Sequence, residues 1–182
     1  MALKFTTSWM EDSRALMAYY RKLGEGAMAQ VEDARLFEAL NDESNSIGVI
    51  VKHMSGNMKS RWTDFLTSDG EKTWRDRDAE FDNAALTREG LMQAWDEGWD
   101  CVFQALEGLT DADLGRTITI RGEAHSVLQA ISRQLTHYAY HVGQIVVLAK
   151  HFQGSAWKKL SIARGQSAEF NAKVQAGELS QR

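Results

Sequence analysis

The sequence contains no proline and only one cysteine, Cys101. A single cysteine excludes an intrachain disulfide, so we expect a reducing compartment. The absence of proline removes the strongest interruption of helices and favours long helices whose ends are set by glycine and by Ser, Thr or Asp caps. The composition therefore predicts a mostly helical protein.

Long hydrophobic runs are also absent, and no stretch approaches the roughly 20 apolar residues that a membrane span requires. Residues 1–8 lack the basic start and apolar centre of a secretory signal. The formal net charge is -4, and lysines and arginines are too scattered to form the basic face of a nucleic-acid-binding protein. We therefore expect a cytoplasmic protein that binds neither membranes nor nucleic acids.

Apolar residues recur at spacings of three and four in four segments, a pattern typical of amphipathic helices. Capping residues precede these segments, and glycine follows the third. We predict four helices, at about 8–33, 42–66, 87–108 and 126–152, and the second of them is capped by a residue within 42–45. We also predict a helical turn at 36–39 and a strand or extended segment at 116–122.

The 182 residues, 43% of them hydrophobic and 25% charged, are enough for a single domain covering 1–182. We predict an all-α fold, a four-helix bundle with one long crossover loop and a short extended segment before the fourth helix. The crossover, residues 67–86, is polar and densely charged. It is interpreted either as a solvated connection between parallel helices or as a loop whose charges line a pocket.

Two histidines, His137 and His141, lie four residues apart in the fourth predicted helix. Residues at this spacing share one helix face, so both imidazoles can bind the same ion. The spacing alone is half of a zinc site at best and often arises by chance. His53 occupies a similar position, at the margin of the apolar stripe of the second helix. Since bundle cofactor sites are built from facing helices, these histidines would supply three ligands to one metal and leave a position for water or substrate.

Two further reactive side chains are interpreted as structural. Cys101 lies off the apolar stripe of the third helix and has no histidine or basic residue beside it in sequence. His125 lies at the start of the fourth helix, where a solvent-facing or capping role is expected before metal ligation.

Short motifs along the chain are characteristic in combination. They are Ser44 to Ile47, Ile50 to His53, Gly56-Asn57, Arg61 to Thr67, Asp69 to Glu71, His137 to Ile145, Trp157, Leu160 to Ile162 and Arg164-Gly165. Together these segments resemble the DinB-like (YfiT-like) superfamily of metal-binding four-helix bundles, and particularly a bacterial branch of unassigned function. The resemblance covers nearly the whole chain. It departs from the branch at Thr73 and Ala163, where the branch tends to have proline.

In that superfamily, one histidine from the second helix and a His-x-x-x-His pair from the fourth bind a divalent metal. The resemblance therefore implies that His53, His137 and His141 are metal ligands. Zn or Ni is favoured, and Fe, Mn and Co are also compatible with imidazole ligands. No residue is assigned a catalytic role, although Asn57 and Arg61, together with Gln144 and the loop around Trp74, are candidates for the pocket beside the metal.

Superfamily members include bacillithiol transferases and a mycothiol-dependent isomerase, in which the metal activates a low-molecular-weight thiol. The resemblance implies a metal-dependent enzyme of the small-thiol S-transferase type, acting on a small-molecule substrate. A hydrolase that uses metal-activated water and a non-enzymatic metal-binding or stress-response module remain alternatives. The resemblance, together with six tryptophans and seven methionines, also predicts a homodimer.

Overall fold

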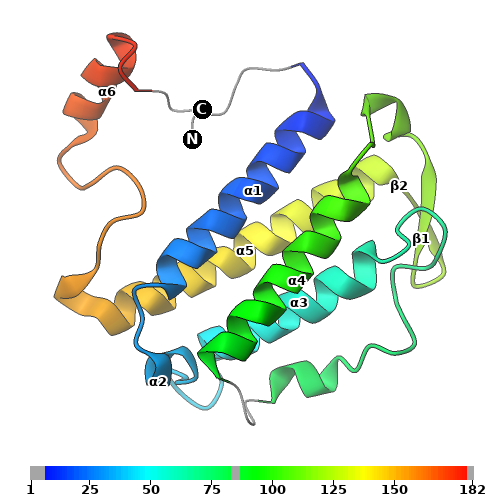
Figure 1. Ribbon diagram of the computed structural model, residues 1–182, viewed down its shortest axis with the longest axis horizontal. Coiled ribbons are helices and arrows are strands. Elements are labelled where there is room, and N and C mark those ends of the chain that lie inside the picture. The colour runs from blue at the N-terminus through cyan, green and yellow to red at the C-terminus, as the bar shows by residue number, and fades with distance from the viewer. Residues whose placement is uncertain (1–6, 83–86, 180–182) are drawn as a thin grey trace.

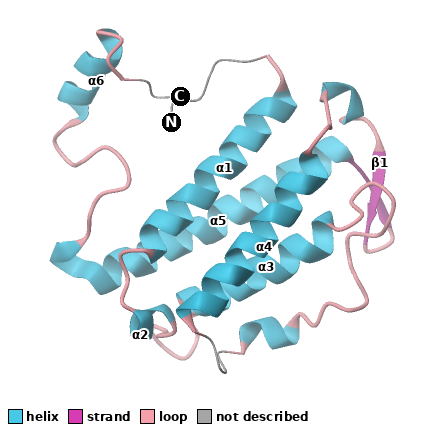
Figure 2. Ribbon diagram, viewed as in Figure 1, coloured by secondary structure: helices cyan, strands magenta, loops and turns pink. Residues whose placement is uncertain are grey.

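The computed structural model describes residues 7–82 and 87–179. Four long helices pack around one hydrophobic core (Figures 1 and 2). α3 packs most extensively against α4 and α1 against α5, while α3 also contacts α5. The last contact brings the histidine-bearing helices together. The four helices are α1 (Trp9–Met28), α3 (Ile47–Trp62), α4 (Arg88–Leu106) and α5 (Val127–Gln153).

Each long helix begins after a serine or threonine whose side chain accepts a backbone hydrogen bond from the residue three positions on. The predicted cap at Thr87 is confirmed, and so are the helix starts predicted near residues 8 and 126. The cap of α3 is Ser46, which follows the predicted 42–45 segment. Such bonds satisfy backbone N–H groups that have no partner within the helix. The four caps are Ser8, Ser46, Thr87 and Ser126.

Three helices end earlier than the hydrophobic pattern predicts. α1 ends at Met28 and not near residue 33, because Arg88 donates hydrogen bonds to the carbonyls of Met28 and Val31 and so stabilises the turn that follows the helix. α3 ends at Trp62 and not near residue 66, because the next backbone is extended and Asp64 adopts a left-handed conformation with φ of 50°. α4 ends at Leu106, two residues before Gly108. Apolar residues that follow the end of a helix can keep the three- and four-residue spacing although the backbone is no longer helical, so the pattern predicts helices that are too long.

The predicted extended segment is one strand of a hairpin, so the mostly helical fold also contains a small sheet that the all-α prediction lacked. β1 (Thr117–Ile120) pairs antiparallel with β2 (Glu123–Ser126), and Ile120 lies opposite Glu123. The sequence of β2 lacks the β-branched alternation of β1, so its conformation depends on hydrogen bonds to its neighbour.

Short helices complete the described chain. The predicted turn at 36–39 lies slightly earlier, in α2, and α6 was not predicted because it belongs to a polar segment without a strong apolar stripe. These elements are α2 (Asp33–Leu36), η1 (Asp78–Phe81), η2 (Asp111–Asp113), η3 (Gly154–Ala156) and α6 (Ser167–Gln175).

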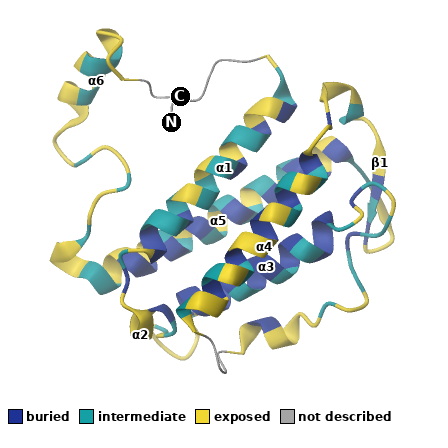
Figure 3. Cartoon of the chain, viewed as in Figure 1, coloured by how far each residue is buried: buried dark blue, intermediate teal, exposed yellow. Residues whose placement is uncertain are grey.

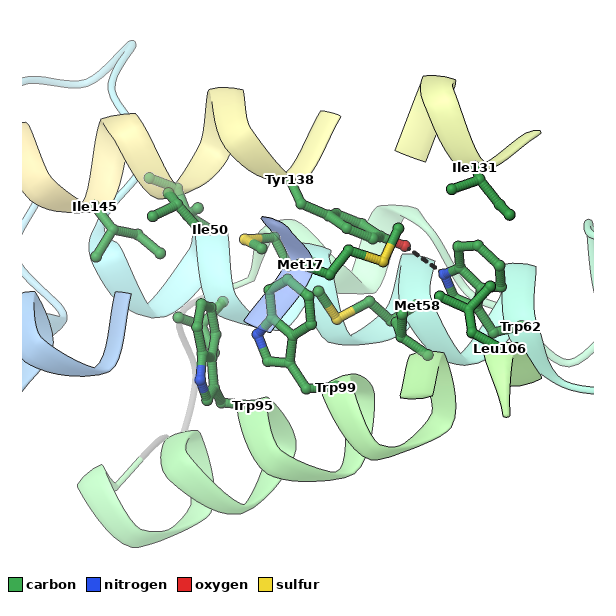
Figure 4. Close-up of a cluster of buried hydrophobic side chains, with 14 of the residues drawn as sticks. Met17, Ile50, Met58, Trp62, Trp95, Trp99, Leu106, Ile131, Tyr138 and Ile145 are labelled. Carbon is green, nitrogen blue, oxygen red and sulfur yellow. Dashed lines mark hydrogen bonds between the residues drawn. The ribbon is translucent and has the colours of Figure 1, made fainter. Parts of the chain in front are cut away.

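Large side chains from all four long helices fill the core, and the faces turned inward are buried (Figures 3 and 4). Trp62 donates a hydrogen bond to the hydroxyl of Tyr138 over 2.8 Å, and that hydroxyl donates to Oδ1 of Asn57 over 3.2 Å. These bonds fix the position of α5 against α3. No helix in residues 7–82 and 87–179 is long and apolar enough to cross a membrane.

The crossover between α3 and α4 follows the surface in two stages. After α3, it passes the hairpin, where the backbone N–H of Gly70 donates to the carbonyl of Thr119 over 2.8 Å. It then returns along α3 to η1, which packs against that helix (Figure 1). Because α3 and α4 run in the same direction, the chain needs this long return. Residues 83–86 of the predicted loop lie outside the described residues.

Candidate metal centre

The structure brings the three histidines of α3 and α5 together. The Nε2 atoms of His137 and His141 lie 3.0 Å apart, and those of His53 and His137 lie 3.4 Å apart. One ring nitrogen from each of the three histidines lies within 4.8 Å of the others. The four-residue spacing on α5 accounts for one pair, and the contact between the helices adds the third imidazole.

The distances between these nitrogens suit ligands of a single ion. Two imidazole nitrogens that each lie about 2.05 Å from a tetrahedral metal are about 3.3 Å apart. The separations of 3.0 and 3.4 Å lie on either side of this value. The nitrogens of the third pair, His53 and His141, lie within 4.8 Å of each other, so the three side chains could hold one divalent ion after they move closer together.

Two of the imidazoles are oriented by hydrogen bonds on the far side of the ring. Nδ1 of His53 lies 2.9 Å from Oε2 of Glu80, and Nδ1 of His141 lies 2.8 Å from Oε1 of Gln144. In this orientation, Nε2 of Gln144 donates to the hydroxyl of Tyr140 while the amide oxygen faces His141. Both oxygens act as acceptors, so each Nδ1 carries the proton and each Nε2 directs a lone pair towards the centre of the cluster.

Glu80 reaches His53 from the crossover loop and is itself held by Arg75. Nε of Arg75 donates to Oε1 of Glu80 over 2.7 Å, and Nη2 donates to Oε2 over 2.9 Å. Gly56 of α3 makes room for this carboxylate, since a Cβ atom there would collide with it. Charged residues of the loop therefore contact the histidine cluster, in agreement with the interpretation of residues 67–86 as a loop whose charges line a pocket.

The protonation states of the cluster also favour metal binding. Burial lowers the pKa of His137 to about 3, and the positive charges that His141 and His53 would carry add to the effect. Burial lowers the pKa of His141 as well, although its hydrogen bond to Gln144 opposes the shift. Burial would raise the pKa of Glu80, but hydrogen bonds from His53 and Arg75 and the charge of Arg75 outweigh it, so the pKa is lowered. Neutral imidazoles and an ionised outer carboxylate are the forms that a metal site requires.

A cavity of about 200 Å³ adjoins the cluster. Among the pocket candidates named from the sequence, Asn57 and Arg61 line this cavity. Gln144 contacts the far side of the His141 ring, and Trp74 is exposed. The cavity is lined by nine residues from α3, α5, the crossover and the hairpin: His53, Asn57, Arg61, Arg75, Arg77, Arg121, Arg133, Gln134 and His137. Larger hollows occur elsewhere on the described surface, but no histidine lines them.

The remaining candidates lie outside the cluster. His125 belongs to β2, and the Sγ atom of Cys101 lies 3.6 Å from the hydroxyl of Thr63 near the end of α3. Sequence reasoning missed Arg75 and Glu80. Their only signal was the density of charge in the crossover, which does not indicate which charges turn inward.

Comparison with family models matches residues 4–166 to the family described as "Protein of unknown function (DUF1572)". The chain belongs to this family. The matched range includes all three histidines, Arg75 and Glu80, so the whole cluster lies within the DUF1572 region. No curated protein and no solved structure gives a significant match.

Proposed function

We propose that this DUF1572 protein is a single-domain, DinB-like four-helix bundle that binds a divalent metal through His53, His137 and His141. We propose further that it is a metal-dependent enzyme of the small-thiol S-transferase type. The observation that carries the proposal is the convergence of three Nε2 atoms, two of them on rings whose Nδ1 atoms are already hydrogen bonded. The four packed helices and the origin of the histidines support the superfamily assignment.

The number of ligands supports a catalytic site over a structural one. Among the residues that the structure describes, no cysteine, aspartate or glutamate joins the three histidines as a fourth ligand. Structural zinc sites close all four positions, whereas catalytic sites use three protein ligands and leave one position for water or substrate. The cavity beside His53 and His137 provides space for a substrate.

A divalent ion in this position would lower the pKa of a thiol or water molecule bound to it and so supply a nucleophile at neutral pH. The residues of this chain hold the ligands in place for that purpose. Glu80 fixes the ring of His53, Arg75 fixes Glu80, and Gln144 fixes the ring of His141. Imidazole ligands favour Zn or Ni in this proposal and are also compatible with Fe, Mn and Co.

Metal analysis of protein purified without an affinity tag or chelator tests the first part of the proposal. We expect about one divalent ion per chain in the wild type. His53→Ala and His141→Ala should lose most of it, because only two ligands remain. His125→Ala is the matched control and should retain the ion. Full occupancy in His53→Ala, or equal loss in His125→Ala, would refute the proposed centre.

Assays of the metal-loaded protein test the second part. Transfer of small thiols such as bacillithiol, mycothiol or glutathione to electrophilic acceptors should require the ion and be lost in His141→Ala. Hydrolysis of ester or amide substrates without any thiol requirement would favour the hydrolase alternative. A metal-loaded protein inactive in both assays would favour a metal-binding or stress-response module.

We also propose that the protein is a homodimer. Tyr140 and Val147 lie seven residues apart on α5, and their side chains are 63% and 65% exposed. Large apolar groups at this spacing share a helix face, which supports contact with a second copy.

A further inference from the structure

Five arginines line the cavity beside the histidine cluster, although they lie far apart in the sequence. Arg61 comes from α3, Arg75 and Arg77 from the crossover, Arg121 from the hairpin turn and Arg133 from α5. Arg61 and Arg75 are buried at their side chains, and the other three are more open to solvent at the mouth. Like charges repel, so such a gathering in so small a space needs compensating anions.

The described acidic residues compensate these charges only in part. Glu80 pairs with Arg75, and Glu71 lies 3.1 Å from Arg61 and 2.9 Å from Arg121. These two carboxylates thus serve three of the five arginines. Asp69 lies close by, but its carboxylate accepts hydrogen bonds from the backbone N–H groups of Arg121 and Gly122.

Two arginines at the mouth have no acidic partner among residues 7–82 and 87–179. Within the described part of the chain, neither Arg77 nor Arg133 makes an ion pair with a carboxylate. Arg77 contacts the ring of Phe81 instead, 5.9 Å from its centre. Both guanidinium groups are therefore available to a ligand.

Two buried polar groups in the cavity wall also lack partners. Arg61 is 5% exposed and Gln134 3% exposed, yet Nε of Arg61 and Oε1 of Gln134 make no hydrogen bond to any residue that the structure describes. Buried polar atoms are nearly always hydrogen bonded, so unsatisfied ones that share a cavity point to a ligand or an ordered water. Rotation of the Gln134 amide would direct its NH₂ group at an anion.

The hairpin turn holds Arg121 in a costly conformation. Arg121 and Gly122 form the two-residue turn with φ of 56° and 77°, the type I′ geometry for which Asn-Gly is preferred. Asparagine tolerates this left-handed conformation better than arginine does. Asp69 stabilises the turn through both backbone N–H groups. The strain is explained if the guanidinium group is needed at the cavity mouth.

We propose that this cavity binds the oxyanion of a small molecule, a carboxylate or phosphate group, directly beside the metal centre. The inference rests on the proposed function in identifying that molecule as the substrate, because His53 and His137 line the same cavity. The guanidinium groups hold the anion through charge-assisted hydrogen bonds, which are strong and can be bidentate. The rest of the molecule then extends towards the three imidazoles.

Calorimetric titration of the full chain with malonate and with inorganic phosphate tests the anion site. Malonamide, which matches malonate in shape but carries no charge, is the negative ligand. We expect at least one of the two anions to bind, malonamide not to bind, and the affinity to fall as salt is added, since the site is open to solvent at three of its arginines. Absence of binding by both anions at millimolar concentration would overturn the proposal.

Arg121→Asn is the decisive variant, because asparagine suits the turn and the fold should be at least as stable as the wild type. Removal of one guanidinium group should weaken anion binding on the order of tenfold. Arg133→Gln should act similarly, whereas Arg35→Gln on α2 removes the same charge away from the cavity and should have no effect. Unchanged affinity in Arg121→Asn, or equal weakening in Arg35→Gln, would overturn the proposal.

The same preparations separate this inference from the proposed metal centre. Arg121→Asn should retain its metal, whereas His141→Ala should lose the metal and still bind the anion within a few-fold of wild type. If metal binding fails while the anion site behaves as expected, only the proposed function is wrong. If anion binding disappears with the metal in His141→Ala, the anion was bound by the metal ion and the arginine site is refuted.

Discussion

Replacement of Glu80 by glutamine tests whether the crossover loop controls the metal centre. The variant keeps the shape of the side chain but removes the negative charge that accepts from Nδ1 of His53 over 2.9 Å. Loss of such an outer carboxylate typically weakens metal binding by about 10 to 100-fold, or about 1.4 to 2.7 kcal/mol. Glu80→Gln should therefore bind the ion at least tenfold more weakly, although all three histidines remain.

The variant should also be less stable without metal. The side chain of Arg75 is 2% exposed and loses its anionic partner, because a glutamine offers one neutral acceptor oxygen in place of the two carboxylate oxygens. Breaking a buried ion pair costs about 3 to 5 kcal/mol. We expect the lower end, about 3 kcal/mol, because Glu71 remains 4.0 Å from Arg75.

Competition with a chromophoric chelator measures the affinity, and urea unfolding of the metal-free protein measures the stability. Glu97→Gln is the matched control, since Glu97 pairs with Lys59 on the exposed surface and should change neither quantity by more than about 1 kcal/mol. Wild-type metal affinity in a folded Glu80→Gln protein would refute the role assigned to Glu80. A loss of the same size in Glu97→Gln would show that the effect is not specific to the site.

Three further predictions follow from the same geometry. The pKa of His137 is about 3 in the folded protein and 6.5, its ordinary value, in the unfolded chain. Between these pH values the unfolded state binds more protons, so the stability of the metal-free protein should fall as the pH drops below about 6.5. A melting temperature that rises on acidification, or that falls identically in His137→Gln, would contradict this. Gly56→Ala should displace Glu80 from α3 and so weaken both folding and metal binding. Gly143→Ala has open space around the added methyl group and should stabilise the protein by about 0.5–1 kcal/mol. Equal effects of the two substitutions on melting temperature and metal affinity would contradict the close contact between Gly56 and Glu80. Light scattering should give about twice the chain mass of 20.5 kDa, and Tyr140→Glu should shift the mass towards one chain; a single-chain mass for wild type across micromolar concentrations would refute the dimer.

The outer contacts of the cluster show why the crossover is long. A loop that only joined two parallel helices would be free to remain solvated, but this one contributes Arg75 and Glu80 to the interior and Gly70 to the hairpin. Glu80 of the crossover thus reaches His53, and Arg77 of the same loop lines the cavity beside it. Changes in this loop should therefore affect the site even though no metal ligand lies within it.

The sequence alone determined the features that depend on local spacing. The 3.6-residue helical period places His137 and His141 on one face of α5, and the hydroxyl groups of Ser8, Thr87 and Ser126 mark helix starts because their hydrogen bonds reach only three residues along the chain. The position of His53 beside an apolar stripe was also readable, since that stripe had to face other helices. Its pairing with the other two histidines was predicted from the bundle and the family resemblance, and the contact between α3 and α5 now places the three rings together.

Only the tertiary structure decided the partners that lie outside helical periodicity. Glu80 and Arg75 belong to a segment in which nearly every residue is polar, so no period distinguishes the buried pair from its exposed neighbours. β2 exists because β1 lies beside it, and the five arginines of the cavity come from positions 61 to 133 of the chain. Contacts between distant segments depend on how the long helices pack, and that packing places a charged loop, a hairpin turn and a helix face around one small space.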